Sequence, residues 1–478
     1  MPGPQVNSGR EAGSDLLLEL SSSGPHRAAV AAALREAVRS GRLAPGTRLP
    51  PYRSLAADLG VARNTVADAY AELVAEGWLT ARQGSGTRVA ERVAARAQRA
   101  PAKAPGRGAL TVHDLRQGQP DATSFPRAAW TASVRRAVAA APHDAFAPGG
   151  PQGRPELRRA LAEYLARVRG VSAAPGQIVV CAGFAHALRL LFGGVLSGPL
   201  AVEPYGLPFH RQILADAGVR TIPLGLDADG ARTDRLASHP DASARRGARA
   251  VLLTPAHQFP TGGPLHSTRR AAAVDWARGR GGVVVEDDYD GEFRYDREPV
   301  GAVQGLDPDH VVYIGSVSKS LSPAIRLGWL VLPPHLVDAV LTAKGLREAW
   351  TGVTDQLALA EFIESGQYDR HVRRMRQRYR ARRNQLVAAL AERAPHIPVT
   401  GIAAGLHAVL RLPPGTEAST VEAAAQAGAA LDGLAFFRHP ASPLPHRDGL
   451  VVGYATPPEH RYRPALDALC RALPPAEA

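Results

Sequence analysis

Lysine is rare in this chain, and one lysine stands among residues that could support carbonyl chemistry. Subtracting the three lysines from the 57 basic residues leaves 54 arginines. Lys319 lies in SVSKSLSPAIRLGW, residues 316–329, and two hydroxyls and a cation in the same stretch come from Ser316, Ser318 and Arg326. A primary amine can lose its proton and form an imine with an aldehyde, whereas a guanidinium stays protonated. Lys319 is therefore a candidate nucleophile, although a lysine taken alone is more often a solvated surface residue.

A second set of polar residues, which includes Asp287 and Tyr289, follows another apolar run. GVVVEDDYD, residues 282–290, places Asp287 and Tyr289 after GVVVE. Pyridoxal phosphate needs an amine for its aldehyde, a carboxylate for its ring nitrogen, a donor for its phenolic oxygen, and hydroxyls and a cation for its phosphate. Lys319 would form the internal aldimine, Asp287 would pair with the ring nitrogen, and Tyr289 would hydrogen-bond the phenolic oxygen. The phosphate would be held by Ser316, Ser318 and Arg326. EDDYD alone could equally be a solvated acidic loop.

These residues follow short apolar runs that are typical of buried strands. The runs are IVVCAG (178–183), AVEP (201–204), AVLLTP (250–255), GVVVEDD (282–288), VVYIGSVS (311–318) and GWLVLP (328–333). Amphipathic stretches such as ALRLLFGGVL and TRRAAAVDWARG lie between most of them. Apolar strands that alternate with helices predict a largely parallel α/β sheet covered on both faces. Because ligands bind such sheets at the carboxyl ends of the strands, we expect the polar residues to meet there.

The first 90 residues predict a different kind of unit. HRAAVAAALREAVRSG, residues 26–41, has apolar residues at four-residue steps and predicts a helix. YRSLAADLG, residues 52–60, predicts a short helix, and a second helix begins about three residues later, which is the helix-turn-helix pattern. WLTARQGSGTRVA, residues 78–90, predicts a hairpin that turns at Gly84 and Gly86. A hairpin directly after a helix-turn-helix makes a wing.

The second helix of this pattern would read double-stranded DNA. Arg63, Asn64 and Thr65 lie in its first turn, the part of a recognition helix that enters the major groove. Arginine suits guanine edges, asparagine suits adenine edges, and threonine suits phosphate or a thymine methyl. Arg48 and Arg53 precede this helix and suit phosphates, and the predicted DNA-contacting set also includes the hairpin residues Gly84 and Gly86. The net charge of +13 agrees with a polyanionic partner, but an arginine-rich composition alone can produce it.

Composition suggests where the domains begin and end. ERVAARAQRAPAKAPGRGALTV, residues 91–112, is rich in Ala, Arg and Pro and indicates a linker. Residues 1–24 predict a disordered tail, which leaves a DNA-binding domain at 25–90 and a larger domain at 113–478. No run reaches the ~18 apolar residues of a membrane span, and the first residues lack a signal-peptide core. The two cysteines give no disulfide framework and no metal spacing, so we expect a cytoplasmic protein without a metal site.

Both parts of the chain resemble known families. SGRLAPGTRLPPYRSLAADLGVARNTVADAYAELVAEGWLTARQGSGTRVA resembles the GntR family of winged-helix repressors. Residues 113 to about 475 look like fold-type I aminotransferases, through SVSKSLSPAIRLGW, TPAHQFPTG and GPQGRPELRRALAEYL. The combination resembles the MocR subfamily of transcriptional regulators. This resemblance implies a winged helix-turn-helix joined to a large aminotransferase-like α/β domain, with a mostly parallel sheet and a smaller C-terminal α/β subdomain. It also implies pyridoxal 5'-phosphate as cofactor and a homodimer with its cofactor sites near the subunit interface.

Several positions of the cofactor site depart from the aminotransferase pattern. The family's Gly-Ser-Gln phosphate turn appears as Gly-Phe-Ala, so backbone amides at Phe184 and Ala185 would bind phosphate without a hydroxyl. Leu207 stands where an aromatic residue usually stacks on the cofactor, and Tyr205 is the alternative. Phe259 replaces the Asn of the usual NPTG turn.

Other departures concern substrate, partner and DNA contacts. Val451 stands where an arginine usually clamps a substrate carboxylate, and Arg411 or Arg438 could take over that contact. Pro148 replaces the tyrosine that reaches the partner subunit's phosphate, and Ala67 replaces an arginine that many GntR members carry in the reading helix.

These observations favour a DNA-binding transcriptional regulator that binds pyridoxal phosphate at Lys319 and senses the cofactor or a small amine or amino acid. Losing the clamp removes a contact worth about 1.5–3 kcal/mol, so efficient turnover is not expected, although residual transamination stays open. Two alternatives remain. The chain could be an active aminotransferase with an attached DNA-binding domain, which steady conversion of an amino donor with a keto acid would reveal. Its large domain could instead be a dimerisation scaffold without cofactor, which would lack a visible absorption band.

Overall fold

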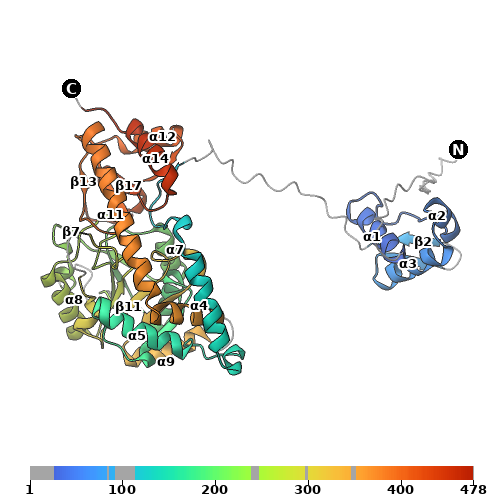
Figure 1. Ribbon diagram of the computed structural model, residues 1–478, viewed down its shortest axis with the longest axis horizontal. Coiled ribbons are helices and arrows are strands. Elements are labelled where there is room, and N and C mark those ends of the chain that lie inside the picture. Colours follow the sequence, from blue (N-terminus) through green and yellow to red (C-terminus); the bar gives the residue numbers. More distant parts are fainter. Residues whose placement is uncertain are drawn as a thin grey trace, which may run out of the picture. The chain divides into compact units, whose positions relative to one another are not determined.

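The computed structural model contains two compact units, Met1–Arg107 and Gly108–Ala478 (Figure 1). It describes residues 26–82, 86–91, 113–237, 247–295, 300–345 and 351–476. The predicted tail, nearly all of the predicted linker and Gly84 lie outside the described residues. The predicted domain limits therefore stay predictions.

The first unit is a winged helix. Tyr70 ties the third helix to the preceding loop, because its hydroxyl donates to Pro50 O at 3.1 Å. Arg35 of the first helix pairs with Glu72 at 2.6 Å and also with Glu76, both on the third helix. The elements are α1 (His26–Arg39), α2 (Tyr52–Asp58), α3 (Arg63–Ala75), β1 (Leu79–Arg82) and β2 (Gly86–Val89), with β1 and β2 antiparallel. The helix-turn-helix and the hairpin expected from the sequence are thus confirmed.

A seven-stranded sheet forms the centre of the second unit. Its order is β4-β12-β11-β10-β9-β5-β6, and all neighbours are parallel except the two pairs that involve β12. The strands are β4 (Ile178–Cys181), β5 (Leu200–Val202), β6 (Thr221–Pro223), β9 (Ala250–Leu253), β10 (Val283–Asp287), β11 (Val311–Ser316) and β12 (Gly328–Val331). Five of the six apolar runs contain one strand each, and the run at 201–204 overlaps β5, which confirms the predicted mostly parallel sheet; β6 lies outside these runs.

Both faces of this sheet are covered, which explains why its strands are apolar throughout. Val180 and Trp329 belong to one buried cluster, whereas their chain neighbours Val179 and Leu330 belong to another. The helices of this part are α4 (Arg127–Ala140), α5 (Pro155–Arg169), α6 (Phe184–Leu190), α7 (Pro208–Asp216), α8 (Ser267–Arg280), α9 (Pro334–Lys344) and α10 (Val353–Glu364). None of the described helices is long and apolar enough to cross a membrane.

The C-terminal part forms a smaller α/β subdomain around an antiparallel sheet of order β13-β14-β17-β16. Figure 1 shows α11 extending from this subdomain toward α5. A short strand β3 (His113–Asp114) pairs with β15 (Ala429–Ala430), so the start of the described second unit is anchored here. The other elements are α11 (Gln367–Arg393), β13 (Val399–Thr400), β14 (His407–Arg411), α12 (Glu417–Gln426), β16 (Asp432–Gly433), α13 (Leu434–Phe437), β17 (Gly449–Gly453) and α14 (Glu459–Ala472). A separate hairpin joins β7 (Leu226–Asp227) and β8 (Gly230–Ala231).

One close backbone contact in the large sheet requires glycine. A Cβ atom at Gly328, the first residue of β12, would lie 2.7 Å from Gly183 Cα and 2.9 Å from Gly315 O. These are backbone atoms, so no side chain can rotate away to make room.

We expect Gly328→Ala to lower the free energy of unfolding by about 1–3 kcal/mol, because the added methyl must push strands apart. Urea unfolding measures the effect. Gly149→Ala is the matched control, since no atom lies within 4 Å of its Cβ position; it should change stability by less than about 1 kcal/mol. Equal stability of the two variants would contradict the steric argument.

Candidate cofactor site and nucleic-acid interface

A cavity of ≈ 280 Å³ opens at the carboxyl ends of β10 and β11. Asp287 ends β10 and Ser316 ends β11, and the two strands are parallel neighbours. All nine residues predicted to hold the cofactor line this cavity: Phe184, Ala185, Tyr205, Asp287, Tyr289, Ser316, Ser318, Lys319 and Arg326. Leu207 lines it as well. The structure brings the predicted group together; the role of each residue stays a prediction.

The acidic run at the end of β10, residues 286–290, is divided between two environments. Asp287 and Tyr289 line the cavity, whereas the alternate residues Glu286, Asp288 and Asp290 do not. Side chains of successive residues in an extended chain point to opposite sides, which accounts for this division. The run is therefore not a solvated loop, because those three alternate carboxylates are buried.

Each of the three buried carboxylates has its own partner. Glu286 accepts hydrogen bonds from the backbone N–H groups of Val303 and Gln304, at 2.9 and 3.0 Å. Asp288 pairs with the guanidinium of Arg169 at 2.6 and 3.0 Å. Asp290 lies 2.8 Å from the imidazole of His257. The Tyr313 hydroxyl also donates to Asp288 at 2.7 Å. These contacts leave Asp287 as the carboxylate of the run that faces the cavity.

Burial shifts the pKa values of the two charged groups that matter most. The pKa of Lys319 is lowered by burial, against the attraction of Asp287 and Asp290. Burial, and then repulsion by Asp288, raises the pKa of Asp287 well above its ordinary value. A lowered pKa makes a neutral, nucleophilic amine more accessible.

The phosphate side of the predicted site is built by two turns that approach one another. A Cβ atom at Gly183 would lie 3.9 Å from Ser318 Oγ, so the Gly-Phe-Ala turn lies against the serine-lysine turn. Arg326 is the one non-glycine residue in the described ranges with a positive φ, of 57°. Left-handed backbone is unfavourable for such a residue and is often retained at binding sites. Hydroxyls, a cation, an amine and a carboxylate around one cavity fit pyridoxal phosphate.

The first described residues of the second unit also reach the cavity, which the sequence did not indicate. Gln117 lines it, and Gly118 O accepts a hydrogen bond from Lys319 Nζ. This segment is held on the small subdomain by Thr456, whose hydroxyl lies 2.9 Å from Arg116 O. A backbone carbonyl leaves no side-chain signal in a sequence.

Glu203 and His210 are two further lining residues that sequence reasoning missed. Glu203 is buried and accepts a hydrogen bond from Thr254 Oγ1 at 2.5 Å, and burial raises its pKa to about 7. The ring centroids of His210 and Phe184 lie 4.7 Å apart, and burial lowers the pKa of His210 to about 4. Glu203 could have been found, because it directly follows the apolar strand β5, just as Glu286 and Asp287 follow the valines of β10.

Neither predicted substitute for the carboxylate clamp reaches the cavity. Val451 is fully buried in an apolar cluster, and its strand neighbour across β14 is Val409. Arg438 donates to the carbonyls of residues 442 and 444, and neither it nor Arg411 lines the cavity. Among the described residues, the arginines that line it are Arg211 and Arg326.

The predicted DNA-contacting residues of the first unit are largely exposed. Arg63 and Asn64 begin α3, and Arg53 lies on α2. Thr65 is half-buried. Arg48 is exposed beside the wing, where its Nε would lie 3.2 Å from a Cβ atom at Gly86. No described acidic side chain forms an ion pair with Arg48, Arg53 or Arg63, so these cations are available to phosphates.

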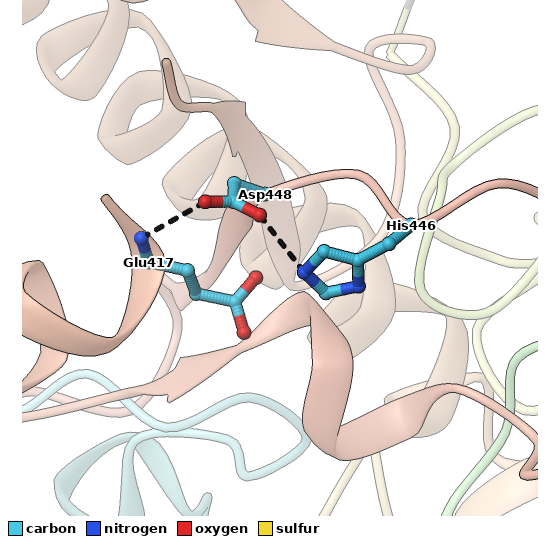
Figure 2. Close-up of side chains that lie close together, drawn as sticks. All are labelled: Glu417, His446 and Asp448. Atoms are coloured by element: carbon cyan, nitrogen blue, oxygen red, sulfur yellow. Dashed lines mark hydrogen bonds and ion pairs between the residues drawn. The ribbon is translucent and has the colours of Figure 1, made fainter. Parts of the chain in front are cut away.

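One cluster in the described part of the chain has the residue types of a metal site. Figure 2 shows Glu417, His446 and Asp448 in the small subdomain, with the imidazole 2.9 Å from Asp448. Backbone N–H groups already occupy the carboxylates, because Glu417 accepts from residues 435 and 449 and Asp448 accepts from the Glu417 N–H. These contacts fasten α12 to α13 and to the start of β17, and they explain both acids without an ion.

Comparison with known proteins finds relatives for both units. Residues 26–89 match the gntR family of bacterial regulatory proteins, and residues 111–441 match aminotransferase class I and II. The chain is 33% identical over 470 residues to the probable rhizopine catabolism regulatory protein MocR of Rhizobium meliloti, covering 92% of each chain. It is 33% identical over 385 residues to the HTH-type pyridoxine biosynthesis transcriptional regulator PdxR of Corynebacterium glutamicum, covering 79% of this chain and 81% of that one. The structure of the multiple substrate aminotransferase of Thermococcus profundus superposes with a TM-score of 0.68 and 26% identity, over 76% of this chain and 92% of that one.

A winged helix joined to an aminotransferase-like domain defines a DNA-binding transcriptional regulator. The chain belongs to the GntR family of bacterial regulatory proteins and, within it, to the MocR subfamily.

Glu203 gives a pH-dependent prediction. Because its pKa is about 7 in the folded protein and 4.5 ordinarily, the stability it contributes below about pH 4.5 is lost as the pH rises to about 7. Relative to Glu203→Gln, the wild-type free energy of unfolding should therefore fall by up to about 3 kcal/mol across that range. Urea unfolding at a series of pH values measures this difference. Glu163→Gln, at an exposed glutamate of α5, is the control and should keep the wild-type dependence of the unfolding free energy on pH. If Glu203→Gln showed that same dependence, the raised pKa of Glu203 would be contradicted.

Proposed function

We propose that this regulator binds pyridoxal 5'-phosphate covalently at Lys319 and acts in the bacterial cytoplasm as a homodimer on an operator. The proposal depends on the position of Lys319, a half-buried amine with a lowered pKa in the same cavity as Asp287. When bound, the cofactor supplies an aldehyde that reacts with the amine and a ring that withdraws electrons. Asp287 would hold a proton at the ring nitrogen, and Tyr289 would donate to the phenolic oxygen. The phosphate would be bound by Ser316, Ser318 and Arg326, with the backbone amides of Phe184 and Ala185.

The proposed signal is cofactor occupancy, or its exchange with a small amine or amino acid. Val451 argues against efficient transamination, because its buried side chain offers a substrate carboxylate no charge-assisted hydrogen bond. PdxR, a relative of this chain, is named for regulation of pyridoxine biosynthesis, which supports a cofactor-related signal. The alternative is an active aminotransferase with an attached DNA-binding domain, which the resemblance to the Thermococcus profundus enzyme supports.

The proposed switch requires that the ligand bind two arrangements of the protein unequally. With a typical coupling, pyridoxal phosphate should change the affinity for DNA by about 5- to 150-fold. The probe is a DNA fragment that the purified full-length protein selects from a random library, titrated with and without the cofactor. Lys319→Ala should bind DNA but show no response, and Lys319→Arg should behave likewise because a guanidinium keeps the charge without forming an imine. A full response in both variants would contradict a covalent switch at Lys319.

DNA contacts from α3 and α2 should differ in kind. Arg63→Ala should weaken binding to the selected fragment by about 1–3 kcal/mol and relax its sequence preference, as expected for a base contact. Arg53→Ala should weaken binding to all sequences and reduce the slope of log affinity against log salt by about 1, as expected for a phosphate contact. Arg135→Ala, at an exposed arginine of α4 in the other unit, is the control. Unchanged binding in both α2 and α3 variants would contradict the proposed reading surface.

A further inference from the structure

A buried histidine-aspartate pair lies directly behind the tyrosine of the proposed cofactor site. His257 and Asp290 are 3% and 2% exposed, and Nδ1 lies 2.8 Å from Oδ2. The hydroxyl of Tyr289 lies 3.0 Å from the same Nδ1 and 3.0 Å from His257 O. His257, Asp290 and Tyr289 therefore form one hydrogen-bonded group.

The small subdomain closes this group off from the side opposite the cavity. A Cβ atom at Gly405 would lie 2.4 Å from Asp290 Oδ2 and 2.5 Å from His257 Cε1, and the His407 ring lies 5.3 Å from the His257 ring. The space left beside the pair has a volume of ≈ 10 Å³, about the least that holds a water molecule. The other oxygen of Asp290 is buried without a hydrogen-bond partner. Among the described residues, the carboxylate of Asp290 therefore has its hydrogen bond from His257 Nδ1.

The donors and acceptors determine which atom carries which proton. An ionised carboxylate only accepts, so the proton between Asp290 and His257 belongs to Nδ1. Since Nδ1–H also faces the tyrosine oxygen, that oxygen accepts there and its own proton points elsewhere. In the structure this proton goes to His257 O, at the edge of the cavity that Tyr289 lines.

Without the imidazole, the tyrosine would meet an unpaired buried carboxylate. Leaving a buried charge without its partner is costly, and the Tyr289 hydroxyl lies close enough to donate to Asp290. A tyrosine that donates to Asp290 has no proton left for a ligand in the cavity. Other charged or titratable groups around the pair are Asp287, Lys319 and Glu203 on the cavity side and Arg294, Tyr295, Tyr454 and His407 on the remaining sides.

We infer that His257 is a positioning residue for the cofactor: by donating Nδ1–H to Asp290, it keeps the hydroxyl proton of Tyr289 available to the cofactor's phenolic oxygen. This inference rests on the proposed binding of pyridoxal phosphate. His257 touches neither the cavity nor the reacting amine, and it acts through Tyr289.

A double-mutant cycle on the full-length protein tests this role, with the dissociation constant of pyridoxal phosphate as readout, followed by its visible absorption. His257→Leu should weaken cofactor binding by about tenfold, the value of one hydrogen bond. In a Tyr289→Phe background the same substitution should change it by less than about twofold, because the hydroxyl that His257 serves is already absent. His257→Asn should restore most of the loss, since its amide can donate from near the Nδ1 position.

The matched control is His407→Leu, which alters a histidine packed on the same ring whose Nε2 lies near Pro260 O rather than Asp290. It should change cofactor affinity equally in both backgrounds or not at all. If His257→Leu fails to fold, His257→Gln carries the test, because its longer amide does not place a donor at Nδ1. Equal losses from His257→Leu in both backgrounds would overturn the inference. A wild-type protein that gives no visible band with the cofactor would instead overturn the proposed function, and the inference with it.

Discussion

Burying three carboxylates at one strand end is the constraint on which the proposed cofactor site depends. Glu286, Asp288 and Asp290 are each 5% exposed or less, and a buried charge is strongly unfavourable unless it is paired or hydrogen-bonded. Their partners come from separate parts of the chain: the backbone at residues 303–304, Arg169 at the end of α5, and His257 after β9. Because those partners satisfy one side of the run, Asp287 and Tyr289 are left to face the cavity.

The same constraint relates the site to the packing of the sheet. Arg169 reaches Asp288 only if α5 packs against the sheet, and a side chain at Gly405 of the small subdomain would collide with both His257 and Asp290. Each acid of the run therefore depends on a different neighbour. Damage to any of these contacts would alter the electrostatics around Asp287 without touching a residue that lines the cavity.

The sequence predicted the strands and the meeting point of the polar residues because both follow from local patterns. Apolar runs mark strands buried on two faces, and carboxyl ends of adjacent parallel strands lie together, which brought Asp287 and Lys319 to one cavity. Contacts between distant segments could not be predicted in this way. The carbonyl of Gly118 has no side chain to signal it. The exclusion of Arg411 from the cavity required the register of β14 with β17, and that of Arg438 its hydrogen bonds to the carbonyls of residues 442 and 444. The roles of the DNA-facing and cofactor-facing residues remain predictions.

The hydrogen bond from Lys319 to Gly118 has a topological consequence. Residues 113–117 separate Gly118 from the end of the predicted linker, so Lys319 contacts the backbone close to where the described part of the second unit begins. An amine that forms an imine has fewer protons to donate, so the proposed reaction of Lys319 would weaken its hydrogen bond to Gly118 O. In the proposed switch, a reaction at Lys319 would therefore first change a contact at the beginning of the described second unit rather than one in its core.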